Sequence, residues 1–188
     1  KGDLEDNEIV MDDTQKRFKF IHLVGAHTPF IYDSDCNIID MKDGTYEQNA
    51  EASITLAAMY IDALKKSGAY DDTALIIMAD HGYNGDYTSE YEFMRQAALF
   101  LVKGRGETHD TMQTSQIPVA YEDLPGAYER LMDGERSNGI FDWQENDSRE
   151  RRFLYYDFNK EDIMIEYIQT GHAQDMTTMV PTGREFNR

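Results

Sequence analysis

An apolar run that ends in Asp80-His81-Gly82 is the part of the sequence best suited to chemistry. The run Ala74–Ala79 is typical of a buried strand that delivers two polar side chains to one end of a sheet. A carboxylate buried there needs a partner, and carboxylate with imidazole suits Zn, Mn or Fe without excluding Mg or Ca. Gly82 permits the turn at which both side chains converge. The pattern therefore predicts a divalent metal site in a hydrolase or transferase; a turn-capping Asp beside a structural histidine is the alternative.

A second candidate, His27, follows another apolar segment. Lys19–Gly25 has the aromatic and β-branched content of a strand. A histidine at its end can hydrogen-bond a tetrahedral anion or protonate a leaving oxygen. Because neighbouring strands end at one edge of a sheet, we expect His27, Asp80 and His81 to share that edge. A surface loop histidine is the alternative.

The elements that must position these residues predict an α/β fold. A helix is expected over Tyr46–Ser67, since Thr45 and Gln48 have capping-box spacing and Gly68 suits the position after its end. Its expected apolar stripe consists of Ile54, Ala57, Ala58, Ile61 and Leu64. Strand, helix and strand in this order predict a mixed, mainly parallel sheet flanked by helices.

The rest of the chain predicts a third strand, a second helix and a small antiparallel sheet. The third strand is Ala97–Val102, and Pro125 and Gly134 frame a helix over Tyr121–Met132. Three short strands separated by turn residues make the C-terminal sheet within residues 152–188: Arg152–Phe158, Ile163–Thr170 and Met176–Val180.

Composition and charge narrow the class of protein. The formal net charge of the 188 residues is −18, which disfavours binding to nucleic acid or to anionic membrane surfaces. The single cysteine, Cys36, excludes an internal disulfide. No apolar run approaches the roughly 18 residues that span a bilayer. Residues 1–17 are interpreted as an acidic leader, and a first residue other than Met leads us to expect a piece of a longer protein.

Two stretches resemble motifs of the sulfatase branch of the alkaline-phosphatase-like superfamily, which includes lipoteichoic acid synthases and phosphoethanolamine transferases. They are Phe20–Phe30 (FIHLVGAHTPF) and Ile76–Gly82 (IIMADHG). The resemblance extends to the helix between them, Ala98–Gly104 and Ile117–Leu124, and so covers residues 18–134. A weaker match continues through the C-terminal sheet. The resemblance implies that residues 18–188 form the C-terminal part of a truncated catalytic domain of this type.

The resemblance also assigns roles. Asp80 and His81 match the late metal ligands of the family, with Mn, Mg, Ca or Zn as the ion, and His27 matches the histidine that contacts the sulfate or phosphate group. The family's nucleophile and early acidic ligands precede the first motif and have no counterpart here. We therefore expect the parent protein to be a hydrolase or phosphotransferase of small-molecule, lipid-linked or glycan-linked sulfate or phosphate esters. The isolated chain is expected to be inactive.

Partners and location follow from the same resemblance. The chain is expected to need the missing N-terminal half of its domain, and the parent to be anchored at the extracytoplasmic face of a bacterial cell membrane. A truncated sheet would expose an edge, through which the chain could dimerise.

Three loop residues are weaker candidates for substrate binding. Asn84 follows the metal pair, while Arg105 and His109 lie in the Gly-rich segment Gly104–Ser115. A solvated loop is the alternative for each.

A different class of function stays open: a non-catalytic interaction or regulatory module that keeps the fold without the chemistry. The segment upstream of Lys1 discriminates between the two. A hydroxyl or cysteine nucleophile after a strand there would favour the enzyme, and its identity would separate a sulfatase from a phosphotransferase.

Overall fold

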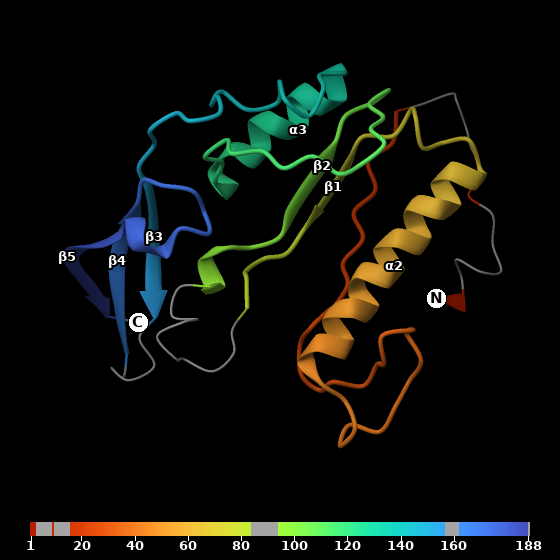
Figure 1. The fold of residues 1–188 in the computed structure, drawn as a ribbon, viewed down its shortest axis with the longest axis horizontal. Coiled ribbons are helices and arrows are strands. Elements are labelled where there is room, and N and C mark those ends of the chain that lie inside the picture. Colours follow the sequence, from red (N-terminus) through yellow and green to blue (C-terminus); the bar gives the residue numbers. More distant parts are fainter. Residues whose placement is uncertain (3–8, 10–15, 84–93, 157–161, 188) are drawn as a thin grey trace. The chain divides into compact units, whose positions relative to one another are not determined.

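The computed structural model, whose elements are drawn in Figure 1, has two compact units, Lys1–Thr73 and Ala74–Arg188. It describes residues 1–2, 9, 16–83, 94–156 and 162–187. The fold combines helices with two antiparallel sheets, of two and three strands, so the predicted mixture of α and β structure is confirmed. The predicted boundaries at residues 17, 134 and 152 stay predictions.

The first unit is built on helix α2, Tyr46–Lys66, which confirms the predicted helix. The capping box also forms: Thr45 Oγ1 accepts from the amide of Gln48 at 3.2 Å, and Gln48 Oε1 accepts from the amide of Thr45 at 3.0 Å. Ala52 and Leu64 of the helix are buried. The predicted stripe is only partly covered, because Ile54 is 52% exposed.

The expected strand Lys19–Gly25 is not formed. The segment has no ladder partner among the described residues, and Phe20 and Val24 are 79% and 76% exposed. A strand exists only where a second chain segment satisfies its backbone groups, whatever its intrinsic preference.

The second unit begins with a two-stranded ribbon of β1, Leu75–Met78, and β2, Phe100–Lys103. The strands are antiparallel, with Leu75 opposite Lys103 and Met78 opposite Phe100. The expectation of a mainly parallel sheet is therefore wrong for the described residues. Parallel pairing needs a crossover that returns the chain to the end where β1 starts, whereas β2 enters from the end where β1 finishes.

One face of the ribbon packs against helix α3, Leu124–Asp133, which follows a 3₁₀ turn, η2, Tyr121–Asp123. The second helix thus starts with a tighter turn than the sequence predicts, and it ends at Gly134, whose φ of +97° suits glycine. The core between ribbon and helix comprises Ala127, Leu131, Ile140 and Phe141, packed on Ala74, Ile76, Phe100, Val102, Ile117 and Val119.

The C-terminal sheet confirms the predicted antiparallel meander. Its strands are β3, Arg151–Tyr156, β4, Ile163–Gln169, and β5, Met179–Asn187, in the order β3-β4-β5. The third strand starts later than expected, because Asp175 caps a 3₁₀ turn, η3, at Met176–Thr178.

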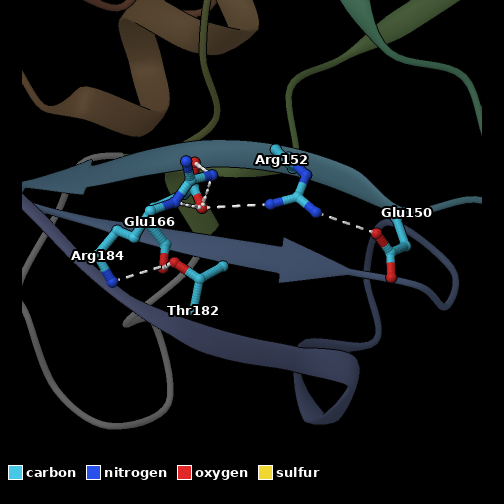
Figure 2. A network of polar contacts seen from close by, with 5 residues as sticks. All are labelled: Glu150, Arg152, Glu166, Thr182 and Arg184. Carbon is cyan, nitrogen blue, oxygen red and sulfur yellow. Dashed lines mark hydrogen bonds and ion pairs between the residues drawn. The ribbon is translucent and has the colours of Figure 1, made fainter.

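Glu166 of β4 is the centre of a polar network on one face of this sheet (Figure 2). Arg184 Nε lies 2.9 Å and Arg152 Nη1 3.3 Å from Glu166 Oε2, and Arg152 Nη2 reaches Glu150 Oε2 at 3.2 Å. Hydrogen bonds from Arg184 hold the pKa of Glu166 below its usual value. The network joins all three strands and the residue before β3.

No helix in the described ranges combines the length and the apolar character that crossing a membrane requires. The predicted dimer through an exposed sheet edge stays a prediction.

Candidate functional site

The Asp80–His81 pair lies directly beyond the end of β1, as the sequence predicts. Two main-chain hydrogen bonds frame it: the Ala79 amide donates to Leu99 O at 3.0 Å, and the Gly82 amide donates to Arg95 O at 2.7 Å. Both acceptors belong to the segment that leads into β2. The pair therefore sits in a short stretch of backbone that is anchored on both sides.

The side chains of the pair converge. His81 Nε2 lies 3.8 Å from Asp80 Oδ2, while Asp80 Oδ1 accepts from the His81 amide at 3.0 Å. The Asp80 side chain is 90% exposed and the His81 side chain 37%. His81 Nδ1 lies 2.7 Å from the carbonyl oxygen of Gly82. Because a carbonyl can only accept, Nδ1 carries the proton, and Nε2 of the neutral ring keeps a free lone pair toward Asp80.

This geometry fits a shared cation. Metal–nitrogen and metal–oxygen distances of about 2.1 Å each sum to about 4.2 Å. The 3.8 Å between Nε2 and Oδ2 is smaller than that sum, so both atoms can contact one ion. A backbone carbonyl on the far nitrogen is also the usual way in which a ligating histidine is oriented. Within the described ranges, however, no group of three or more His, Cys, Asp or Glu is arranged to hold a metal.

Tyr121 of η2 belongs to this site and was not found from the sequence. Its hydroxyl donates a hydrogen bond to the carbonyl oxygen of Ala79. Burial and the nearby charge of Asp80 raise the pKa of Tyr121. The sequence contains no sign of this contact, which joins residues 42 apart and depends on how η2 packs on the ribbon.

His27 lies in the first unit, in an exposed loop, with Nδ1 2.6 Å from the carbonyl oxygen of Thr28. By the same tautomer argument its Nε2 is available to a ligand. Asp80 and His81 lie in the second unit. The shared site of all three residues stays a prediction.

Arg105 and His109 follow the other end of the ribbon. In the antiparallel register, β2 finishes opposite Leu75, at the end where β1 starts. His109 Nε2 lies 3.5 Å from Glu107 Oε1, and Glu107 in turn accepts from the Gly104 amide at 2.7 Å. His109 is thus held near the end of β2, and in this register that end lies about 16 Å along the ribbon from Asp80 at the usual rise per residue. Asn84 lies outside the described residues.

Glu107 is a structural carboxylate that the sequence analysis missed. Besides Gly104, it accepts from the Ser137 amide at 3.1 Å and from Ser137 Oγ at 2.7 Å. Burial alone would raise the pKa of Glu107, but these hydrogen bonds and that of His109 lower it to about 2. The carboxylate joins the end of β2 to the loop after α3.

Comparison with known proteins adds no relative: no family model, curated protein or solved structure matches the chain. The candidate functional site therefore consists of Asp80 and His81, supported by the hydrogen bond of Tyr121 to Ala79.

Proposed function

We propose that the chain supplies Asp80 and His81 as metal ligands to a metal-dependent hydrolase or transferase of sulfuric or phosphoric esters. The observation that carries the proposal is the 3.8 Å approach of His81 Nε2 to Asp80 Oδ2, with Nδ1 anchored on the Gly82 carbonyl. With Nδ1 protonated on the Gly82 carbonyl, Nε2 of the neutral ring is the nitrogen that a cation beside Asp80 would contact.

Each residue then has a defined task. Asp80 contributes an anionic oxygen, and His81 a neutral nitrogen whose orientation Gly82 fixes. When bound, a divalent cation supplies activation of a hydroxyl nucleophile and stabilisation of charge on the transferred group. His27, with its free Nε2, is proposed to contact that group or the leaving oxygen. Because the chain has no nucleophile in the expected context, it is proposed to be inactive alone.

Two features support the proposal that the chain works with a further part of the same domain. The described residues provide a pair of ligands where a divalent ion usually takes four or more. The apolar segment 18–24 is largely exposed, as expected for a strand whose neighbour is missing. The extracytoplasmic, membrane-anchored parent belongs to this proposal and rests on the resemblance alone.

Mn²⁺ binding to the whole chain tests the ligands directly. In a titration followed by electron paramagnetic resonance, we expect binding of micromolar affinity or weaker, since half of the coordination shell is absent. Asp80→Asn and His81→Gln should each abolish it. The matched controls Asp110→Asn and His22→Gln change exposed residues elsewhere and should leave it intact.

The outcomes separate the hypotheses. Mn²⁺ binding that persists in both Asp80→Asn and His81→Gln, or no binding at all, contradicts the ligand assignment and favours a non-catalytic interaction module. Nanomolar affinity contradicts the view that ligands are missing. Turnover of an aryl sulfate or an aryl phosphodiester by the chain alone contradicts the proposed absence of a nucleophile.

A further inference from the structure

Arg151, the first residue of β3, is a buried cation without an ionic partner in the part of the chain that the structure describes. Only 9% of the residue is exposed. Its Nη2 donates to the carbonyl oxygen of Gly171, whereas Nε is shielded from solvent and has no hydrogen-bond partner among the described residues. No carboxylate among the described residues forms an ion pair with it.

The neighbouring arginines, in contrast to Arg151, form ion pairs with carboxylates. Arg149 pairs with Glu122 and Asp123, and Arg152 and Arg184 both pair with Glu166 (Figure 2). An arginine stays protonated at any physiological pH, and a buried charge without compensation costs several kcal/mol. Burial and the nearby charge of Arg149 lower the pKa of Arg151.

The turn beside Arg151 is firmly held. Gln169, which is opposite Arg151 in the β3–β4 register, donates through Nε2 to the carbonyls of His172 and Ala173 at 2.9 and 3.2 Å. Gly171 has no room for a side chain, because an added Cβ would lie 2.4 Å from Thr178 Cγ2. The guanidinium is thus fixed on a pre-formed turn.

The same turn carries a second donor. The Gln174 amide donates to His172 Nδ1 at 3.3 Å, so in the neutral ring the proton lies on Nε2. No hydrogen bond of Nε2 to any described residue is formed. Nε–H of Arg151 and Nε2–H of His172 therefore lack acceptors among the described residues, although Nη2 of Arg151 is bonded to the Gly171 carbonyl.

We propose that Arg151, with His172 as a second donor, binds a tetrahedral oxyanion, namely a phosphate or sulfate group. Such a group supplies the missing negative charge and several acceptor oxygens, and a guanidinium is the side chain best suited to it. The site does not depend on the proposed metal ligands Asp80 and His81.

The test compares the thermal unfolding midpoint of the whole chain in phosphate or sulfate with that in chloride at matched ionic strength. We expect a saturable rise for the wild type and for Arg152→Gln, the matched control from the adjacent, ion-paired position. Arg151→Gln should weaken the apparent affinity by about tenfold or more, since a charge-assisted hydrogen bond contributes about 1.5–3 kcal/mol. His172→Gln should weaken it less. An equal rise in Arg151→Gln, or no rise in the wild type, overturns the proposal.

A measurement on the wild type covers the case in which Arg151→Gln does not fold. The Arg151 Nε–H resonance, assigned by its loss in Arg151→Lys, should shift progressively during a phosphate titration at constant ionic strength. An unshifted resonance overturns the proposal. Repeating both experiments with phenyl phosphate and phenyl sulfate shows whether the anion is free or part of an ester. If the inorganic ions bind as tightly as the phenyl esters, the site binds a free anion. If the esters bind more tightly, the site binds the phosphate or sulfate group of a larger ligand.

Discussion

The hydroxyl of Tyr121 donates a hydrogen bond to the carbonyl of Ala79, the residue that precedes Asp80. This contact ties the 3₁₀ turn before α3 to the end of β1, where the candidate ligands lie. It gives the candidate site a support from a part of the chain that is remote in sequence.

Replacing Tyr121 with Phe should therefore destabilise the second unit. The change removes one hydrogen bond from a carbonyl, and we expect a loss of about 1 kcal/mol in the free energy of unfolding, measured by urea denaturation. Tyr32→Phe is the matched control, because Tyr32 is 39% exposed against 38% for Tyr121. Equal stability of Tyr121→Phe and wild type would show that water replaces the hydroxyl without cost.

Glu107 should make stability depend on acid pH. Its pKa is about 2 in the folded chain against an ordinary value of 4.5, so the folded state binds fewer protons in this range. The contribution is complete above the ordinary pKa and is lost as the pH falls toward 2. At neutral pH it amounts to about 3 kcal/mol.

Glu107→Gln should remove most of this dependence. We expect the unfolding free energy of the variant to be lower at neutral pH and to decline less steeply than that of the wild type between about pH 5 and pH 3, because Glu166 still contributes. Glu129→Gln, at an exposed position of α3, is the control and should decline like the wild type. A wild-type profile in Glu107→Gln would mean that other carboxylates cause the acid sensitivity.

Arg149 should be among the residues that matter most for the second unit. It bonds to Glu122, Asp123 and the Pro118 carbonyl, and its guanidinium lies 4.6 Å from the ring centroid of Trp143. Arg149→Met leaves the largely buried Asp123 without its cationic partner, and we expect a cost of about 3 kcal/mol. Arg149→Lys keeps the charge but not the planar fork, so its cost should be intermediate.

Trp143 is the only tryptophan in the sequence, so its fluorescence reports on this contact during unfolding. Arg136→Met, at an exposed position, should leave both the emission and the unfolding midpoint unchanged. Wild-type emission and midpoint in Arg149→Met would contradict the importance of the stacked guanidinium.

Glu166 should hold the C-terminal sheet together. Glu166→Ala removes the common partner of Arg152 and Arg184, and the thermal midpoint should fall clearly more than in Glu185→Ala, which changes an exposed residue of β5. Because the pKa of Glu166 is lowered, its contribution should be present at neutral pH and decline as the pH falls below the ordinary 4.5. Equal effects of the two variants would assign the network no role in stability.

The sequence predicts what depends on local rules. The capping box of Thr45 and Gln48 forms because its atoms are only three residues apart. The position of Asp80 and His81 beyond β1 follows from an apolar run that stops at a glycine turn.

Pairing between remote segments was not predictable in the same way. Whether Lys19–Gly25 forms a strand depends on a neighbour, not on its own residues, and the direction of β2 depends on how the chain returns to β1. The contact of Tyr121 with Ala79 and the hydrogen bonds of Glu107 arise only after α3 has packed on the ribbon. None of these has a signature in residue spacing.

The carboxylate of Glu107 links the hydrogen-exchange kinetics of two amides that are distant in sequence. The amide protons of Gly104 and Ser137 are both bonded to the same oxygen, Oε2. For either amide to exchange with solvent deuterium, its hydrogen bond to Glu107 must break. Movement of the Glu107 side chain breaks both hydrogen bonds. In hydrogen exchange the two amides should thus behave as a single opening unit, and Glu107→Gln should release them together.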